Sequence, residues 1–275
     1  MPGRRPCPYP TDPSDAEWSV LERRLPAPAR TGRPPKWPRR LKAEAIFYLV
    51  RSGCAWRMLP RHFPPWPTVY AQFARWRRDG AVRRLHDRLR EQAREAEGRS
   101  AEPSAAIIDS QTVRATGVGG SERSYDAAKK ASGRKRHILV DATGLVLLAH
   151  VHAADVPDRA GARRLIETAP ADALPRLELV WADGAYTGPF ARWLAEERGW
   201  RIEMPRHRQR QAWRYGLEER PTGFHVIPRR WVVERTFAWL SRSRRLARDY
   251  ERLPETGEAM IHAAMSRIMF RRVAA

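Results

Sequence analysis

The sequence predicts an α/β protein in which a helical N-terminal part precedes a β-sheet with flanking helices. Two short apolar runs, at 105–109 and 177–183, each predict a buried strand that ends at an aspartate. A hairpin is indicated where Asp141-Ala142-Thr143-Gly144 joins the apolar runs at 137–141 and 145–153. Helix patterns at 155–169, 189–198 and 256–272 alternate with these strands and with a short strand at 201–204. The order is therefore a strand, a hairpin, and then alternating helices and strands.

The N-terminal part carries signals for several short helices. Ser14 and Glu17 form a capping box ahead of the first, and Gly53 ends the second. Thr68 can cap a third helix, over 68–78, and a fourth follows Gly80. The helix, turn and Arg-rich helix resemble a helix-turn-helix, whose recognition helix would be 68–78. Its candidate DNA contacts are Tyr70, Arg75, Arg77 and Arg78. The alternative is a helical bundle with a basic face.

Two connecting segments divide the chain. Residues 26–38 form a basic, Pro-rich connector that cannot pack as a helix. It could place Arg33 in an A·T-rich minor groove, or it could be a solvated linker. Residues 98–104 are small and polar with one proline, so we expect a domain boundary there. The predicted domains are 1–98, helical and DNA-binding, and 99–275, which carries the sheet.

The sheet region contains two polar segments and a pair of histidines. Residues 114–136 lack apolar periodicity and predict a mobile basic loop, and 205–221 predict a polar, basic insertion. His150 and His152 share one strand face, but no third ligand is in view. We therefore expect them to be ordinary strand residues rather than a metal pair.

Composition limits the classes of partner. Lys and Arg number 52 against 31 Asp and Glu in 275 residues, a formal net charge of +21. That excess favours a polyanion, and nucleic acid more than membrane, although a GC-rich genome would also enrich arginine. The hydrophobic fraction of 42% is enough for a core. With two cysteines, no signal segment and no long apolar run, the sequence predicts a cytoplasmic protein.

A helix near the C-terminus offers a third acidic side chain. Residues 229–245 contain no Gly or Pro, and Val233, Phe237 and Leu240 form an apolar stripe. Glu234 lies beside that stripe, in line with Arg230. A surface Arg–Glu pair is the plain interpretation of this pattern.

The acidic helix and the two strands together favour a metal site. Asp109 and Asp183 each end a predicted strand, and ligands in open α/β sheets gather at the carboxyl ends of strands. Hard divalent cations prefer carboxylate oxygens, and two Mg²⁺ or Mn²⁺ ions can promote phosphodiester chemistry. Asp109, Asp183 and Glu234 are therefore the candidate metal ligands and catalytic residues.

On these residues the chain resembles bacterial insertion-sequence transposases of the DDE class, in the branch of insertion-sequence families four and five. The resemblance is carried by 107–113, 133–141, 181–186 and 229–250. The last family motif is Tyr, two residues, Arg, three residues, Glu, six residues, Lys. Arg230 and Glu234 fit it, but Ile227 stands at the Tyr position and Ser241 at the Lys position. Arg242, Arg244 or Arg245 could substitute for the lysine.

The resemblance implies a ribonuclease H-like mixed sheet that holds two Mg²⁺ or Mn²⁺ ions on Asp109, Asp183 and Glu234. It also implies a protein of the bacterial nucleoid that binds double-stranded DNA, namely the inverted repeats of its element and a target. We expect a homodimer or higher oligomer on DNA, with Arg230, Arg242 and Arg245 among the phosphate contacts. The freed 3′-OH would attack target DNA. Alternatives are a ribonuclease H-like nuclease without strand transfer, and an inactive DNA-binding derivative. Asp141, in a turn, is expected to be dispensable for cleavage.

Overall fold

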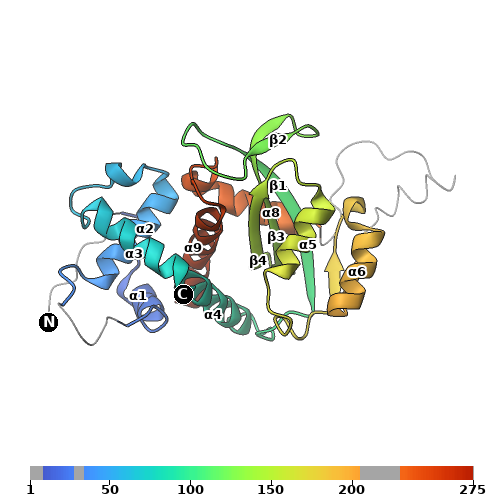
Figure 1. Ribbon diagram of the computed structural model, residues 1–275. Helices are drawn as coiled ribbons and strands as arrows, with labels where there is room; N and C mark the ends of the chain where they lie inside the picture. Colours follow the sequence, from blue (N-terminus) through green and yellow to red (C-terminus); the bar gives the residue numbers. More distant parts are fainter. Residues whose placement is uncertain (1–8, 28–33, 205–229, 275) are drawn as a thin grey trace, which may run out of the picture.

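The computed structural model describes residues 9–27, 34–204 and 230–274, so Arg33 and Ile227 lie outside the described residues. A group of N-terminal helices lies at one end of the molecule and a mixed sheet at the other, with the C-terminal helix between them (Figure 1). The N-terminal elements are α1 (Asp15–Glu22), α2 (Arg39–Ser52), the 3₁₀ turn η1 (Trp56–Met58), α3 (Trp66–Arg78) and α4 (Ala81–Ala96). The predicted capping box is present, because Ser14 accepts the Glu17 N–H and Glu17 accepts the Ser14 N–H.

The sheet contains parallel and antiparallel pairs. Its strands are β1 (Ala105–Arg114), β2 (Ser124–Asp126), β3 (Ala131–Asp141), β4 (Val146–Ala153), β5 (Leu179–Trp181) and β6 (Arg201–Glu203). β1 is antiparallel to β3 on one side and parallel to β5 on the other. β3 also pairs with β2 and β4, and β5 pairs in parallel with β6. A mixed sheet with flanking helices is compatible with the predicted ribonuclease H-like class.

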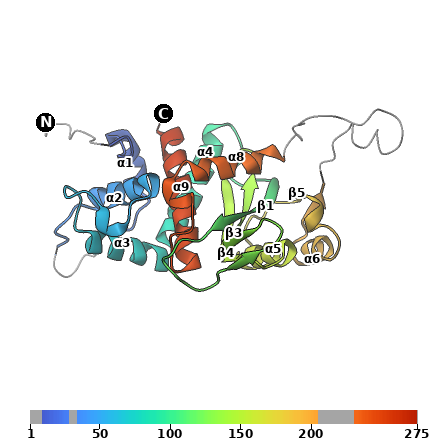
Figure 2. The ribbon, with the colours of Figure 1, turned by 90° about the horizontal axis from the view of Figure 1, so that it is seen from above.

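Helices cover both faces of the sheet (Figure 2). On one face lie α5 (Asp158–Glu167) and α6 (Pro189–Arg198), and on the other lies α8 (Trp231–Ser241). Alternate residues of β1 separate accordingly, since Ile108 belongs to the core under α5 and Ile107 to the core shared with α8. Asp109 is two residues beyond Ile107, so it lies on the α8 face.

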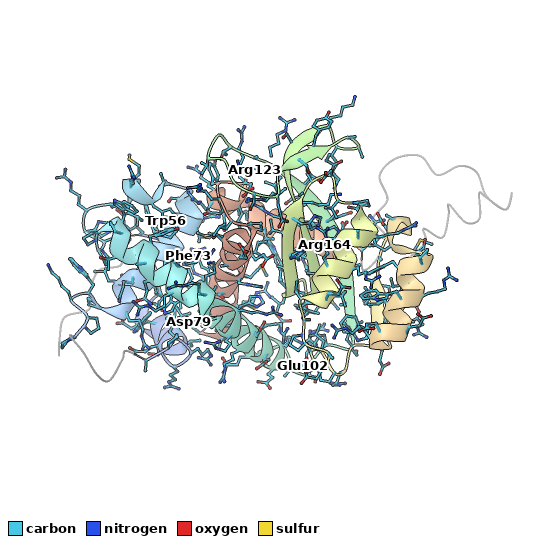
Figure 3. The ribbon with its side chains drawn as sticks, in the orientation of Figure 1. Trp56, Phe73, Asp79, Glu102, Arg123 and Arg164 are labelled. Atoms are coloured by element: carbon cyan, nitrogen blue, oxygen red, sulfur yellow. The ribbon has the colours of Figure 1, made fainter. Side chains whose placement is uncertain are left out.

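The C-terminal helix α9 (Pro254–Val273) contacts both ends of the molecule. It packs against α4 and against β4, and one apolar core includes residues of the N-terminal helices and of the sheet. In Figure 3, Phe73 and Trp56 mark the N-terminal part of that core, with ring centroids 5.7 Å apart. The boundary near residue 98 stays a prediction, because the two regions share this core. No helix in the described ranges is long and apolar enough to cross a bilayer.

Two predictions of local structure are corrected. The third helix begins at Trp66 after Pro65, not at Thr68, because prolines preset the backbone of a first helical turn. Residues 114–136 contain β2 and the start of β3 instead of one continuous loop. The first half of β3 gives no apolar signal, because three of its buried residues are basic, namely Arg134, Lys135 and Arg136.

The hairpin aspartate is more than a turn residue. Asp141 is fully buried, accepts the Leu145 N–H at 2.9 Å and pairs with Arg94 of α4. Removing one partner of a buried ion pair costs about 3–5 kcal/mol, so Asp141 is a poor control position for tests of catalysis.

Two glycines test the packing of helices on this sheet. A Cβ on Gly161 of α5 would overlap His152 and His137, whereas one on Gly257 of α9 would reach only Val151 at 3.6 Å. Replacing a helical glycine with alanine usually stabilises by about 1 kcal/mol. We expect Gly257→Ala to raise the unfolding free energy by about that amount, and Gly161→Ala to lower it, in urea melts. Equal effects of the two substitutions would contradict this packing.

Candidate active site

Asp109 lies within β1, not at its end as predicted. The strand continues to Arg114 because β3 pairs with it as far as Arg114 and Gly133. The parallel pairing with β5 stops earlier, at Ile107 and Trp181. Asp109 is therefore the second residue beyond the last parallel pair, where one side of β1 has lost its strand neighbour.

Asp183 occupies the matching place on the neighbouring strand. It is also the second residue beyond the last parallel pair, because β5 ends at Trp181, two residues before the predicted end at Asp183. Its carboxylate accepts the Ala185 N–H at 2.8 Å and caps the 3₁₀ turn η2 (Gly184–Tyr186). The register thus places the two aspartates side by side along the edge where the parallel pairing ends.

The electrostatic surroundings of Asp109 favour a bound cation. Burial raises the pKa of Asp109 to about 6, against the hydrogen bond from the Ser110 N–H at 2.7 Å. The negative charge of Asp183 also raises the pKa, while Arg230 and Lys129 lower it. A buried carboxylate whose ionisation is opposed by a neighbouring negative charge gains stability from a bound divalent cation.

Glu234 stands on α8 close to this pair but turned toward an arginine. Its side chain is 55% exposed, and Oε1 lies 3.6 Å from the Arg230 guanidinium. The charge of Arg230 also lowers the pKa of Asp109, and α8 packs against β1, so the Arg230–Glu234 pair lies on the Asp109 side of the sheet. Within the described ranges, no group of three or more His, Cys, Asp or Glu side chains is placed to hold a metal ion. The structure therefore places Asp109 and Asp183 at matching positions on neighbouring strands, whereas the Glu234 carboxylate forms an ion pair with Arg230.

The hairpin positions the helix that carries Glu234. Thr236 donates from Oγ1 to the Gly144 carbonyl at 2.8 Å, and Arg235 donates to the Thr143 carbonyl at 2.8 Å. Gly144 has φ +87°, and a Cβ there would meet Thr236 Oγ1 at 2.8 Å. The turn needs glycine for its backbone conformation and for this close approach.

The predicted DNA contacts on α3 fall into two groups. Arg75 and Arg78 are exposed, as is Tyr70, whose ring lies edge-on to Trp56. Arg77 instead donates to Thr256 of α9 at 2.6 Å, which joins α3 to the C-terminal helix.

The arginines that follow α8 also differ from one another. Arg242 is exposed at the end of the helix. Arg245 is buried, donates to Glu251 at 2.6 Å and reaches the Cys54 carbonyl at 3.1 Å. The Arg245 guanidinium is therefore occupied inside the protein in this structure.

Lys129 is a residue near Asp109 that the sequence did not indicate. Its Nζ lies 3.5 Å from the Ser110 carbonyl, and its charge lowers the pKa of Asp109. Lys129 follows the three-residue strand β2, and its backbone N–H binds Asp126 at 3.0 Å. A strand that short gives no periodic signal, so nothing in the sequence could have placed this lysine.

A buried polar network supports both aspartates from the α5 face. Next to Asp109, Ser110 donates to Asp158 at 3.0 Å, and Lys135 reaches the same oxygen at 2.9 Å. In the turn after Asp183, the Tyr186 hydroxyl lies 3.3 Å from His137 Nε2. The segments after both aspartates are thus tied to the same side of the sheet.

The histidines extend that network. His137 Nδ1 lies 2.7 Å from His152 Nε2, whereas His150 contacts Glu258 at 3.0 Å. His150 and His152 thus use their rings in contacts with other side chains of the fold, and their assignment as ordinary strand residues stays a prediction.

The chain is similar to known transposases over most of its length. Residues 100–269 match the family described as "Transposase DDE domain", and residues 14–86 match "Putative transposase of IS4/5 family". A similar curated protein is the "Putative transposase for insertion sequence element IS402" of Burkholderia cepacia, 34% identical over 142 residues. That alignment covers 50% of this chain and 60% of the relative, so the chain spans less than two thirds of that protein. No solved structure matches the chain.

The mixed sheet and its paired aspartates define an α/β protein with an acidic site at the end of its parallel strands. The family match covers more than half of the chain. The chain belongs to the DDE transposase family.

The buried histidines predict loss of stability in acid. Burial lowers the pKa of His152 to about 4 and that of His262 to about 3, and it holds the pKa of His137 well below its usual value. A depressed histidine pKa gives stability that is fully present above about pH 6.5 and lost as pH falls toward the folded-state pKa. For His152 alone the loss is at most about 3 kcal/mol.

Urea melts at pH 7.5, 6 and 5 measure this loss. We expect the unfolding free energy to fall across the series, and to fall less in His152→Gln. The exposed His62 is the control, and His62→Gln should keep the wild-type fall. Stability that stays level from pH 7.5 to 5 would show that the buried histidines accept protons without cost.

Proposed function

We propose that this chain is a DNA transposase whose ribonuclease H-like domain, residues 99–275, cleaves phosphodiester bonds at the ends of its insertion sequence. The observation that carries the proposal is the equal placement of Asp109 and Asp183 beyond the last parallel pair of β1 and β5. Arg230 links the third carboxylate to this pair, because its charge lowers the pKa of Asp109 and its guanidinium pairs with Glu234. Family membership supports this assignment.

The donor set suits hard divalent cations, and we propose Mg²⁺ or Mn²⁺, two ions in all. Asp109 and Asp183 are the adjacent carboxylates, and Glu234 would join them by turning away from Arg230. When bound, such ions activate an attacking oxygen and stabilise a leaving oxygen. The fit rests on two neighbouring carboxylates, one of which is buried and has a raised pKa.

The side chains of the protein itself have three tasks at this site. The Ser110 N–H fixes one oxygen of Asp109, and the Ala185 N–H fixes one oxygen of Asp183, so both carboxylates are oriented before any ligand arrives. Lys129 and Arg230 bring positive charge to the edge of the site, where the DNA phosphate must approach. Arg230, once released by Glu234, is free to pair with that phosphate.

We also propose that the N-terminal helices bind the inverted repeats and that the freed 3′-OH joins target DNA. The IS402 relative is named as a transposase for an insertion sequence element, and the same class of DNA partner is proposed here. Two element ends must be joined to one target, so we propose a homodimer or higher oligomer on DNA in the bacterial nucleoid. Exposed Arg75 and Arg78 on α3 are the expected phosphate contacts.

The carboxylates can be tested one at a time. Asp109→Asn, Asp183→Asn and Glu234→Gln keep shape but remove an anionic ligand, so each should lower cleavage by orders of magnitude. DNA binding should persist, because less negative charge then faces the phosphates. The assay is nicking of a plasmid carrying both element ends with Mg²⁺ or Mn²⁺, beside a gel shift on the same DNA.

The control is Asp172→Asn, an exposed carboxylate in the turn before β5, which should cleave like the wild type. A Glu234→Gln protein that cleaves at the wild-type rate would remove α8 from the reaction. Nicked ends that never appear joined to a second DNA would indicate a nuclease without strand transfer.

The arginines of α3 provide a separate test of DNA binding. Arg75→Gln with Arg78→Gln should weaken binding to the element ends and make it less dependent on salt, because each neutralised phosphate adds about −0.9 to the salt slope. Arg77→Gln should instead lower the melting temperature, because Arg77 holds Thr256. If Arg77→Gln alone weakens binding while Arg75 and Arg78 do not, the contact surface lies elsewhere on the helices.

A further inference from the structure

A small pocket continues the site along β1. It lies between the end of that strand, residues 111–114, the last residue of α8, Ser241, and residues 246–248 (here the β1–α8 pocket). Its volume is about 200 Å³, several times the roughly 30 Å³ that one water molecule occupies in the liquid. It therefore has room for a charged group with some of its water.

The pocket follows the edge of β1 that β5 leaves uncovered beyond Ile107, because four consecutive residues of the strand line it. Gln111 is two residues beyond Asp109, so its side chain leaves the same face of β1, whereas Arg114 leaves the other face at the last residue of the strand. On α8, Ser241 is seven residues after Glu234, two turns along the same side of the helix. The distance from the carboxylates is about 7–17 Å on the strand, at 3.3 Å per residue, and about 10 Å on the helix. The value on the helix falls within the range on the strand.

The charge of the pocket is positive. Arg114 and Arg248 line it and are exposed, and neither guanidinium has an ion pair or hydrogen bond with another described residue. None of the described residues that line it is Asp or Glu. The backbone of each arginine is part of the fold, but its guanidinium has no acidic partner among the described residues.

A third cation lies beneath the same segment. Arg136, opposite Gln111 on β3, is 3% exposed and donates to the Leu246 carbonyl at 2.6 Å. It also reaches the Arg248 carbonyl at 3.4 Å, so a buried charge supports the loop that carries Arg248.

The nearby carboxylates are already paired with other cations. Asp249 pairs with Arg134 at 2.9 Å, and Glu251 pairs with Arg245 at 2.6 Å. The positive charge of Arg114, Arg248 and Arg136 therefore exceeds the negative charge available to it in the described structure.

We propose that the β1–α8 pocket binds backbone phosphates of the DNA strand that is cleaved, through Arg114 and Arg248. This proposal rests on the proposed function. DNA rises about 3.4 Å per nucleotide of one strand, so the separation along β1 corresponds to roughly two to five nucleotides from the cleaved bond. Arginines from a strand and a loop thus add positive charge near the end of α8, beside the exposed Arg242.

Salt dependence of DNA binding tests the proposal without any cleavage. The probe is a fluorescent duplex of one element end, with binding followed by anisotropy at several salt concentrations in EDTA. For the double variant Arg114→Gln, Arg248→Gln, the slope of log K against log salt should become less steep by about 2, from about 0.9 for each phosphate contact. The double variant Arg114→Lys, Arg248→Lys keeps both charges and should restore the slope.

The matched control is Arg164→Gln. Arg164 is an exposed arginine on α5, across the sheet from α8 (Figure 3), and its loss should leave the slope unchanged. A double glutamine variant with the wild-type slope, or with the same change as Arg164→Gln, would overturn the proposal.

Neutral methylphosphonate linkages locate the contact with the wild-type protein, so the result does not depend on the folding of a variant. Neutral linkages two to five nucleotides from the cleaved bond should weaken wild-type binding and have little further effect on the double glutamine variant. Equal weakening of both proteins would overturn the assignment of those phosphates to Arg114 and Arg248.

The outcomes separate this proposal from the proposed function. If the wild type nicks the plasmid and Asp109→Asn does not, the proposed function stands, and the salt slopes alone decide the pocket. If the wild type neither binds nor nicks the element ends with Mg²⁺ or Mn²⁺, the proposed function fails and the pocket assignment fails with it.

Discussion

The unequal pairing of β1 is the constraint on which the site depends. β3 accompanies this strand through Arg114, so its backbone stays extended and its side chains keep their alternation. β5 leaves after Ile107, so one side of the strand is open from Asp109 onward. The extended half supplies rigidity, and the open half gives access to the carboxylates and to the β1–α8 pocket. If β5 continued beside β1, its chain would fill this space.

The large positive charge of the protein is divided between two physical roles. Some basic side chains are buried and matched, as Arg134 is with Asp249 and Arg94 with Asp141. Removing one partner of such a pair would cost about 3–5 kcal/mol, so these charges are committed to contacts within the fold. Others, such as Arg114 and Arg248, are exposed and unmatched within the described structure. Only the second group is available to a polyanion, and net charge alone does not distinguish the two.

The two aspartates are supported by a network on the opposite face of the sheet. Ser110 and Lys135 share Asp158, and Tyr186 reaches His137, so contacts within α5 and β3 hold the residues that follow each carboxylate. Gly161 lets α5 approach these histidines closely. A catalytic constellation needs such support, because a displacement of 1 Å can cost about a hundredfold in rate. The α8 face, by contrast, keeps Glu234 exposed and able to turn.

The sequence by itself determined the hairpin, the capping box, the order of the longer elements and the place of Asp183 just beyond a strand, because apolar periodicity and turn residues are local signals. The tertiary structure decided what local signals cannot express. It buried Arg134, Lys135 and Arg136 inside a strand that the sequence presented as a loop, because their partners lie elsewhere in the chain. It paired Arg245 with Glu251 in a buried ion pair and left Arg114 and Arg248 at the surface. Whether a charged side chain is matched depends on contacts between distant segments, and only the folded chain brings those segments together.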